Sequence, residues 1–171
     1  DIFSNARFIN GVEVQEFEEE SASFLGYSFG VGVSSGTDAL LITMLSLGIK
    51  PNTKVFLPAF TYTASAEAIC LLGATPVFVD VEPQTFLLSP CKLRLAMEKH
   101  SSPGDLIMPV DLFGYPCDYD ELVSVAREFS AKIFVDGAQG FGAEYKNSSC
   151  FYGIEAFCTS FFPAKPLGCF G

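Results

Sequence analysis

The sequence has few of the residues from which zinc sites are built. It contains one histidine, and no two of its six cysteines are spaced as a CxxC pair. Structural zinc sites usually combine four such ligands at short spacings, so no metal site is expected. The even number of cysteines permits disulfides, but several lie within apolar runs, which favours buried, reduced thiols in a cytosolic protein. The cysteines are Cys70, Cys91, Cys117, Cys150, Cys158 and Cys169.

The sequence is also poor in charge, and above all in positive charge. Charged residues make up 18%, and 10 lysines and arginines stand against 20 acidic residues, for a net charge of -10. An acidic chain repels nucleic-acid phosphates and anionic lipid headgroups, so neither is expected as a partner. Hydrophobic residues make up 49%. Because the charged fraction is below the roughly 25% of an average globular domain, we expect surface that a partner subunit or a further part of the chain covers.

Long apolar runs and targeting segments are missing as well. The longest apolar stretch, ALLITMLSLGI, is too short and too polar to span a bilayer. No basic region followed by an apolar core stands at the N-terminus. We therefore expect a cytoplasmic protein without a membrane anchor. The chain opens with a short polar lead and stops at Gly171 without a terminating helix, so we also expect it to be a fragment.

What the sequence does contain is an alternation of helical and strand-like patterns. Ser89 followed by Pro90 predicts a helix start, and Asp118 with Glu121 predicts a capping box. Strands separated by helices of this length indicate one α/β domain, with a mostly parallel sheet covered by helices on both faces. Helices are expected at residues 12–25, 37–48, 63–73, 89–100 and 118–130, and strands at 28–34, 53–60, 75–82, 105–113, 132–138 and 156–162.

Four short motifs fall where the carboxyl ends of such strands meet helix N-termini, which is where parallel α/β proteins collect ligands. In SSGTDAL, the backbone N–H groups around Gly36 and the Thr37 hydroxyl face the positive end of a helix and suit an anion. The alternative is that Ser35 simply caps the helix. In PAFTYTAS, Tyr62 follows a strand end, where its ring either packs in the core or covers a flat cofactor.

The other two motifs carry charged groups. In IFVDGAQG, Asp136 follows an apolar strand and Gln139 lies three residues further on. A carboxylate buried there needs a partner, unless it only caps the following turn. In FCTSFFPAKPLGCFG, Lys165 stands between two prolines, after a run that contains Ser160. A lysine in a dry site becomes nucleophilic toward aldehydes, whereas a solvated lysine in a loop does not.

In this order, the motifs resemble those of one family. A phosphate turn, an aromatic ring, an acid at a strand end and a lysine after a strand are what a pyridoxal phosphate (PLP) site requires. Nearly the whole chain resembles the sugar-nucleotide aminotransferases of the DegT/DnrJ/EryC1/StrS family, through RFINGVEVQEFEEE, VSSGTDAL, PAFTYTASAEAICLLGATPVFVDVEPQTF, VDGAQGFGAEYK and SFFPAKPLG. The resemblance implies the fold of aspartate aminotransferase. Residues 1–171 would form part of its PLP-binding large domain, with the small C-terminal domain missing.

The resemblance also implies the catalytic roles. Lys165 would bind PLP as a Schiff base and then carry a proton, in a site from which water is largely excluded. Asp136 would keep the pyridine nitrogen protonated, and Gln139 would lie beside the ring and its phenolic oxygen. The implied reaction is ping-pong transamination from an amino donor, expected to be glutamate, to a keto sugar nucleotide.

The remaining positions follow from the same resemblance. Tyr62 would stack on the ring, while Gly36, Thr37 and Ser160 would hold the phosphate. Asp111, in PVDLFG, stands where we expect a histidine or a small polar residue in many relatives, and the resemblance assigns it no role.

The subgroup of the family, and with it the expected substrate, is indicated by the segments CTSFFPAKPLGCFG and FTYTASAEAICLLGA. They are most similar to the subgroup that aminates C3 of a UDP-linked 3-oxo uronic acid for bacterial surface polysaccharide or O-antigen, and a homodimer is expected. The alternatives are a 4-oxo substrate, a non-catalytic member that acts in regulation or assembly, and an inactive fragment. The family's sugar dehydratases carry histidine in place of the lysine, so Lys165 argues against them.

Overall fold

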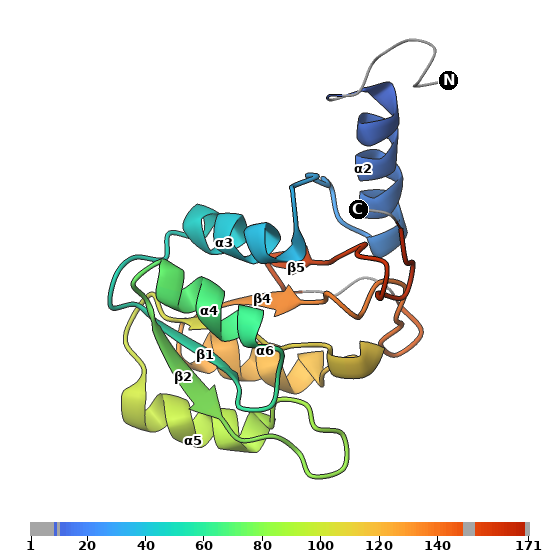
Figure 1. Cartoon of the computed structure of the whole chain (residues 1–171). Helices are drawn as coiled ribbons and strands as arrows, with labels where there is room; N and C mark the ends of the chain where they lie inside the picture. Colours follow the sequence, from blue (N-terminus) through green and yellow to red (C-terminus); the bar gives the residue numbers. More distant parts are fainter. Residues whose placement is uncertain (1–8, 10, 149–152, 170–171) are drawn as a thin grey trace.

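A five-stranded sheet forms the centre of the molecule (Figure 1). The computed structural model describes residue 9 and residues 11–148 and 153–169. The strands follow the order β2-β1-β3-β4-β5, and all neighbouring strands are parallel, which confirms the expected sheet. The strands are β1 (Lys54–Pro58), β2 (Thr75–Val79), β3 (Leu106–Ile107), β4 (Lys132–Asp136) and β5 (Ala156–Cys158).

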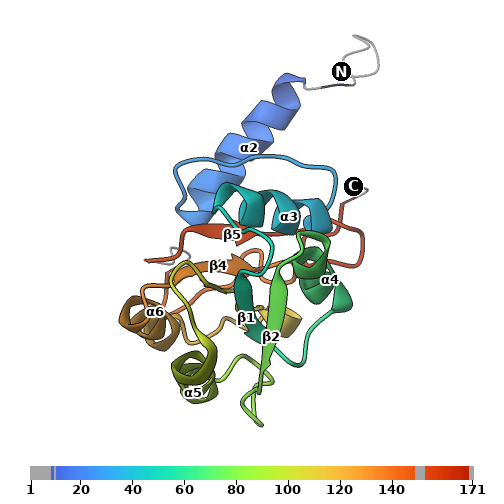
Figure 2. The same ribbon diagram turned by 90° about the vertical axis from the view of Figure 1, so that its left-hand side faces the viewer.

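Helices cover both faces of this sheet, as the alternating pattern predicts (Figure 2). Helices α3 and α4 pack on one face, and α5 and α6 pack on the other. A further helix, α2, extends away from the sheet, and a short 3-10 turn, η1, precedes α6. The helices are α2 (Val12–Leu25), α3 (Gly36–Ser46), α4 (Thr63–Leu71), α5 (Pro90–His100), η1 (Leu112–Gly114) and α6 (Tyr119–Glu128).

The core consists of two apolar clusters, one on each side of the sheet. In β1, Phe56 packs with α5 and α6, whereas Val55 and Leu57 pack with α3 and α4. Successive side chains of a strand point to opposite faces, so a strand covered on both sides must be apolar at every position. This explains why the central strands read as continuous apolar runs.

The predicted helix starts are confirmed at two places. The Ser89 hydroxyl accepts a hydrogen bond from the Lys92 N–H at 3.4 Å, and Pro90 is the first residue of α5. The Asp118 carboxylate accepts from the Glu121 N–H at 3.4 Å at the start of α6. These local signals depend on neighbouring residues alone, which is why the sequence predicts them well.

The strand predicted at residues 28–34 is wrong. The segment runs from α2 to α3 outside the sheet, and Phe29 is 88% exposed. The Gly32 N–H donates to the Glu18 carboxylate at 2.5 Å, so the segment is tied to α2. An alternating apolar pattern produces a strand only where a neighbouring strand supplies backbone hydrogen bonds.

Two other strands differ from expectation. A sheet covered on both faces would bury the segment 75–82, but β2 lies at the sheet edge and leaves Phe78 exposed. The strand expected at 105–113 shortens to β3, since Pro109 has no N–H to donate. Beyond Pro109, a single bridge joins Val110 to Asp136.

Helix α2 carries an apolar stripe that the described residues cover only in part. Val14, Phe17 and Phe24 share a helical spacing and are all exposed, although Phe17 packs edge-on against Phe161 and Phe24 stacks on Phe141. The buried residues of α2 are Ala22 and Leu25. None of the helices in the described part of the chain has the length and apolar character that a membrane crossing requires.

The cysteines of the described residues are free thiols. The expectation of buried thiols is confirmed at Cys117 and Cys158 and is wrong at Cys70 and Cys91, which are exposed on α4 and α5. An apolar run on a helix covers more than the buried face, so it does not bury every residue in it. Cys150 lies outside the described residues.

Candidate active site

Asp136 ends β4 and lies at the carboxyl edge of the sheet. It is 5% exposed. Its Oδ2 accepts a hydrogen bond from the Ser65 hydroxyl at 2.7 Å, and its Oδ1 accepts from the Ala138 N–H at 3.2 Å. The carboxylate therefore does cap the turn that follows β4, but it also has a partner on helix α4.

The charge on Asp136 is only partly compensated. Burial raises the pKa of Asp136, while the hydrogen bonds from Ser65 and Ala138 and the positive charge of Lys165 lower it. Among the described residues, no basic side chain forms an ion pair with this carboxylate. A buried acid with hydrogen bonds but no ion pair would be stabilised by a cationic N–H group on a ligand.

Ser65 is a site residue that the sequence analysis missed. It lies in the first turn of α4, close behind Tyr62, and is buried. Its hydroxyl also contacts the Thr61 hydroxyl at 3.2 Å. The available signal was a small polar residue in the helix turn that follows a strand end, but nothing in the sequence indicates that this turn faces β4.

Ser65→Ala is expected to destabilise the cofactor-free protein by about 1–3 kcal/mol at neutral pH, because it leaves the ionised Asp136 with one hydrogen bond fewer. The Ser65 hydrogen bond lowers the pKa of Asp136 in the folded state, so its stabilisation disappears as falling pH protonates the acid. Denaturant unfolding at neutral and acidic pH measures this. Ser46→Ala, at an exposed hydroxyl at the end of α3, is the control. A loss of equal size at both pH values would contradict the role of Ser65.

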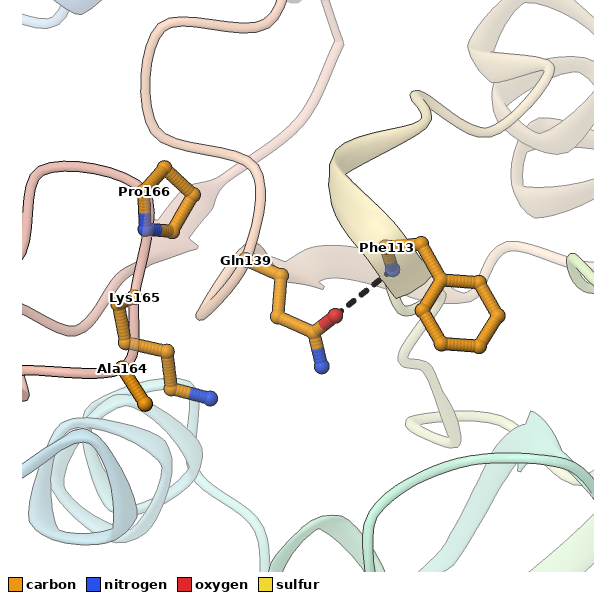
Figure 3. A pocket seen from close by; sticks show the side chains of 5 residues that line it. All are labelled: Phe113, Gln139, Ala164, Lys165 and Pro166. Atoms are coloured by element: carbon orange, nitrogen blue, oxygen red, sulfur yellow. Dashed lines mark hydrogen bonds between the residues drawn. The ribbon is translucent and has the colours of Figure 1, made fainter.

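Lys165 and Gln139 line the same pocket, which has a volume of about 530 Å³. Figure 3 shows the Lys165 amine and the Gln139 amide extending into one open space from two different segments. The Gln139 Oε1 accepts a hydrogen bond from the Phe113 N–H at 2.8 Å. Ala164 and Pro166 complete the lining. The structure thus brings together three residues, Asp136, Gln139 and Lys165, that the sequence predicts for one site.

Lys165 lies in a tight loop that follows β5. Its N–H donates to the Phe162 carbonyl at 2.8 Å, and the Ser160 hydroxyl accepts from the Phe162 N–H at 3.4 Å. Lys165 is half-buried, and the flanking Ala164 and Pro166 are exposed. The expected exclusion of water is therefore not achieved by the described residues alone, because they leave the pocket open on one side.

Gly36 and Ser160 lie in contact although they are distant in the sequence. Gly36 is the first residue of α3, and Ser160 follows the end of β5. A Cβ atom at Gly36 would lie 3.1 Å from the Ser160 Cβ and 3.5 Å from its hydroxyl. Thr37 comes next in the helix. The first N–H groups of a helix have no acceptor within it, so this corner combines free backbone donors with hydroxyl groups. The phosphate site remains a prediction.

Ser35 has the capping role that the alternative interpretation gave it. Its hydroxyl accepts from the Asp38 N–H at 3.1 Å and donates to the Asp38 carboxylate at 3.0 Å. The hydrogen bonds from Ser34 and Ser35 lower the pKa of Asp38. This capping network fixes the start of α3 and with it the position of Gly36.

Tyr62 does not pack in the core. It is the N-cap residue of α4, and the residue is 69% exposed. Its carbonyl accepts from the Ser65 N–H at 3.2 Å, and Ser65 in turn contacts Asp136. Tyr62 therefore stands near the carboxyl edge with an uncovered ring, and stacking on a cofactor remains a prediction.

Asp111, to which the sequence gave no role, is a second buried carboxylate near Asp136. Its Oδ1 accepts from the Tyr119 hydroxyl at 2.5 Å and from the Cys117 N–H at 3.2 Å. Burial raises the pKa of Asp111 from 3.8 to about 6, which these hydrogen bonds oppose and the charge of Asp136 enhances. The folded protein therefore binds this proton more tightly than the unfolded chain does.

Asp111→Asn is expected to remove a pH dependence of stability. Between pH 4 and pH 6 the folded protein retains the Asp111 proton that the unfolded chain has lost. The wild type therefore loses stability relative to the variant as the pH rises through this range. With the pKa at about 6, the difference between pH 4 and pH 7 amounts to about 2 kcal/mol. Denaturant unfolding of both proteins at several pH values measures it. A difference that does not change with pH would show that Asp111 titrates normally.

The comparisons with known proteins agree with this geometry. A sequence model of the DegT/DnrJ/EryC1/StrS aminotransferase family matches residues 1–171. The UDP-2-acetamido-2-deoxy-3-oxo-D-glucuronate aminotransferase of Pseudomonas aeruginosa is 42% identical over 171 residues, which cover 99% of this chain and 46% of that protein. The chain thus spans about half the length of this curated relative.

Solved structures support the fold. A DegT DnrJ EryC1 StrS aminotransferase from Brucella abortus superimposes with a TM-score of 0.88 at 38% identity, over 99% of this chain and 47% of that one. A sugar aminotransferase from Streptococcus pneumoniae in its PLP form superimposes with a TM-score of 0.80 at 31% identity, over 91% and 43% of the two chains. The arrangement of strands and helices is therefore that of known aminotransferases.

Proposed function

We propose, from the fact that this chain belongs to the DegT/DnrJ/EryC1/StrS aminotransferase family, that its protein is a PLP-dependent aminotransferase acting on keto sugar nucleotides. One observation carries the proposal. The Lys165 amine extends into a pocket beside Gln139, and its charge acts on the buried carboxylate of Asp136. These groups come from two strand ends, and an acid, an amide and an amine in one place are what the cofactor needs.

The residues present fit PLP. Asp136 is buried without an ion pair among the described residues, so a protonated pyridine nitrogen would supply the missing cation. The corner formed by Gly36, Thr37 and Ser160 would hold the phosphate, and Lys165 would hold the cofactor covalently. PLP, when bound, supplies an electron sink that stabilises negative charge at a neighbouring carbon. The PLP form of the Streptococcus pneumoniae relative supports this assignment.

Each of the site residues would have a separate role in the reaction. The Lys165 Nζ would take the proton from the α-carbon of the amino donor and return it in the next step. Asp136 would hold a proton on the ring nitrogen through its carboxylate, which Ser65 orients by its hydrogen bond. Gln139, held by the Phe113 N–H, would present its amide N–H to the cofactor. Tyr62 would cover the ring from the N-terminus of α4.

For the substrate, we propose a 3-oxo UDP-N-acetylglucosaminuronate, with glutamate as the amino donor. The support is the relative from Pseudomonas aeruginosa, whose name specifies a 3-oxo glucuronate. The product would serve bacterial surface polysaccharide or O-antigen synthesis in the cytoplasm. A 4-oxo sugar nucleotide is the alternative substrate.

We further propose that two copies of the protein associate. The stripe on α2, with Val14, Phe17 and Phe24, stays between 41% and 55% exposed although Phe17 packs against Phe161 and Phe24 against Phe141. A hollow of about 310 Å³ lies beside it and is lined in part by Phe141. A homodimer that buries this stripe would remove it from water.

The substrate assignment is tested by offering the full-length protein glutamate with either a 3-oxo or a 4-oxo UDP-sugar and measuring the amino sugar formed. We expect kcat/KM for the 3-oxo compound to be higher by about 100-fold or more, since the ketone carbon must lie where the Lys165 amine can deliver a proton to it. Turnover of the 4-oxo compound alone would reject the proposed substrate. Bound PLP without turnover of any keto sugar would favour a non-catalytic member of the family.

A further inference from the structure

Two turns face each other at the carboxyl ends of β3 and β4. One is η1, where the bulky Phe113 adopts a left-handed backbone with φ 59°. Such a conformation is strained for a side chain of this size and persists only where the surroundings hold it. The other turn is closed by the Gly140 N–H, which donates to the Gly137 carbonyl at 2.9 Å. The Phe113 N–H joins the two turns by its hydrogen bond to Gln139 Oε1 at 2.8 Å.

Asp111 contacts both turns. Its backbone N–H donates to the Asp136 carbonyl at 3.0 Å, and its carbonyl accepts from the Gly114 N–H at 3.1 Å. A Cβ atom at Gly140 would lie 2.8 Å from its Oδ2, so the second turn passes directly over the carboxylate. Asp111 is fully buried and does not line the pocket. Any influence it has on the site must therefore act through Gln139 and Asp136.

The start of α6 holds the Asp111 carboxylate in place. The Tyr119 hydroxyl lies 2.5 Å from each of its two oxygens, and the Cys117 N–H donates to Oδ1. Tyr119 is itself buried, and burial together with the charge of Asp111 raises its pKa well above the usual value. Burying the Asp111 carboxylate next to a second acid, Asp136, costs free energy. The hydrogen bonds from Tyr119 and Cys117 offset part of this cost.

We propose that Asp111 is a positioning residue for the active site. Its carboxylate, held by Tyr119 and Cys117, packs under Gly140, while its backbone binds Gly114 and Asp136. Together these contacts set the direction of the Gln139 amide and the placement of Asp136. The link to the cofactor rests on the proposed function, whereas the link between the two turns does not.

The test uses the full-length protein with Asp111→Ala, Asp111→Asn and Tyr119→Phe. Asp105→Asn is the matched control, because Asp105 is also buried and accepts the Lys54 and Ser102 N–H groups at 2.9 and 2.6 Å, but precedes β3 at the opposite edge of the sheet. Hydrogen exchange of residues 111–117 and 137–142 is measured without cofactor. PLP affinity and the steady-state constants are measured separately.

Asp111→Ala is expected to speed exchange in both turns, and to weaken PLP binding, by about tenfold, the equivalent of one lost hydrogen bond. Asp111→Asn, which keeps the shape of the side chain and one acceptor oxygen, should retain most of the wild-type protection from exchange and most of the PLP affinity. Tyr119→Phe should also speed exchange in both turns and weaken PLP binding. If the alanine variant does not fold, Tyr119→Phe tests the positioning role in its place. Asp105→Asn should change neither the exchange of the two turns nor the PLP affinity.

Unchanged exchange in the two turns of the alanine variant, or equal changes in Asp105→Asn, would overturn the positioning role. If the wild type binds no PLP, the proposed function fails, while hydrogen exchange still decides whether Asp111 couples the two turns.

Discussion

Lys165→Ala is expected to lower kcat by about 10³-fold or more and to prevent covalent attachment of PLP. Among the described residues that line the pocket, Lys165 is the one that carries an amine. None of the other described residues in the pocket lining can therefore take over both the bond to the cofactor and the transfer of the proton. The loss should be far larger than the effect of any other single substitution at the pocket wall.

Borohydride reduction followed by peptide mass analysis measures the attachment. The wild type should carry the cofactor mass on the peptide that contains Lys165, and the variant should carry none. Lys132→Ala is a suitable control, because Lys132 begins β4 at the opposite edge and donates to the Leu47 carbonyl at 2.6 Å. Cofactor fixed to another lysine in the wild type would refute the assignment of Lys165.

Asp136→Asn is expected to lower kcat by about 10²–10³-fold while the protein still binds PLP. The amide keeps the size of the side chain and can still accept the Ser65 hydrogen bond. It cannot carry the negative charge that keeps the ring nitrogen protonated, so the electron sink is weakened. KM for the substrates should change much less than kcat, because Asp136 is buried and is not among the described residues that line the pocket.

The same variant should be more stable than the wild type without cofactor. Burial raises the pKa of Asp136 in the folded state, so the ionised acid destabilises the fold increasingly as the pH rises toward neutrality. Asparagine has no such charge, and the gain in unfolding free energy should therefore grow with pH. Asp80→Asn, at an exposed acid that follows β2, is the control. Wild-type turnover combined with unchanged stability would exclude this role for Asp136.

The features that the sequence predicted well depend on near neighbours. Ser89 and Asp118 cap their helices as predicted, because a cap needs only the N–H groups of the next few residues. The parallel sheet followed from the alternation of apolar strands and helices. The wrong predictions concern which side chains are exposed and which segments pair as strands. The segment that contains Phe29 has a strand pattern without a strand beside it, and Phe78 lies at an edge that its apolar run did not reveal.

The candidate site likewise contains residues that the sequence indicated and residues that only the structure revealed. The resemblance singled out Asp136, Gln139 and Lys165, and the structure brings them together. It could not indicate that Ser65 supports the acid, or that Asp111 lies beneath the two turns. Both are small polar or acidic residues in ordinary surroundings along the chain, and only their position in space distinguishes them.

By itself, the sequence determined where most helices and strands lie, where several helices begin, and that an acid follows one apolar strand and a lysine another. These properties arise from periodicity, capping and residue chemistry, all of which are local. Only the tertiary structure decided that Gly36 touches Ser160, that Ser65 donates to Asp136, and that α2 keeps a partly exposed apolar stripe. The physical reason is that such contacts depend on the order and register of the strands, and similar apolar strands can be ordered in more than one way without any change in their local patterns.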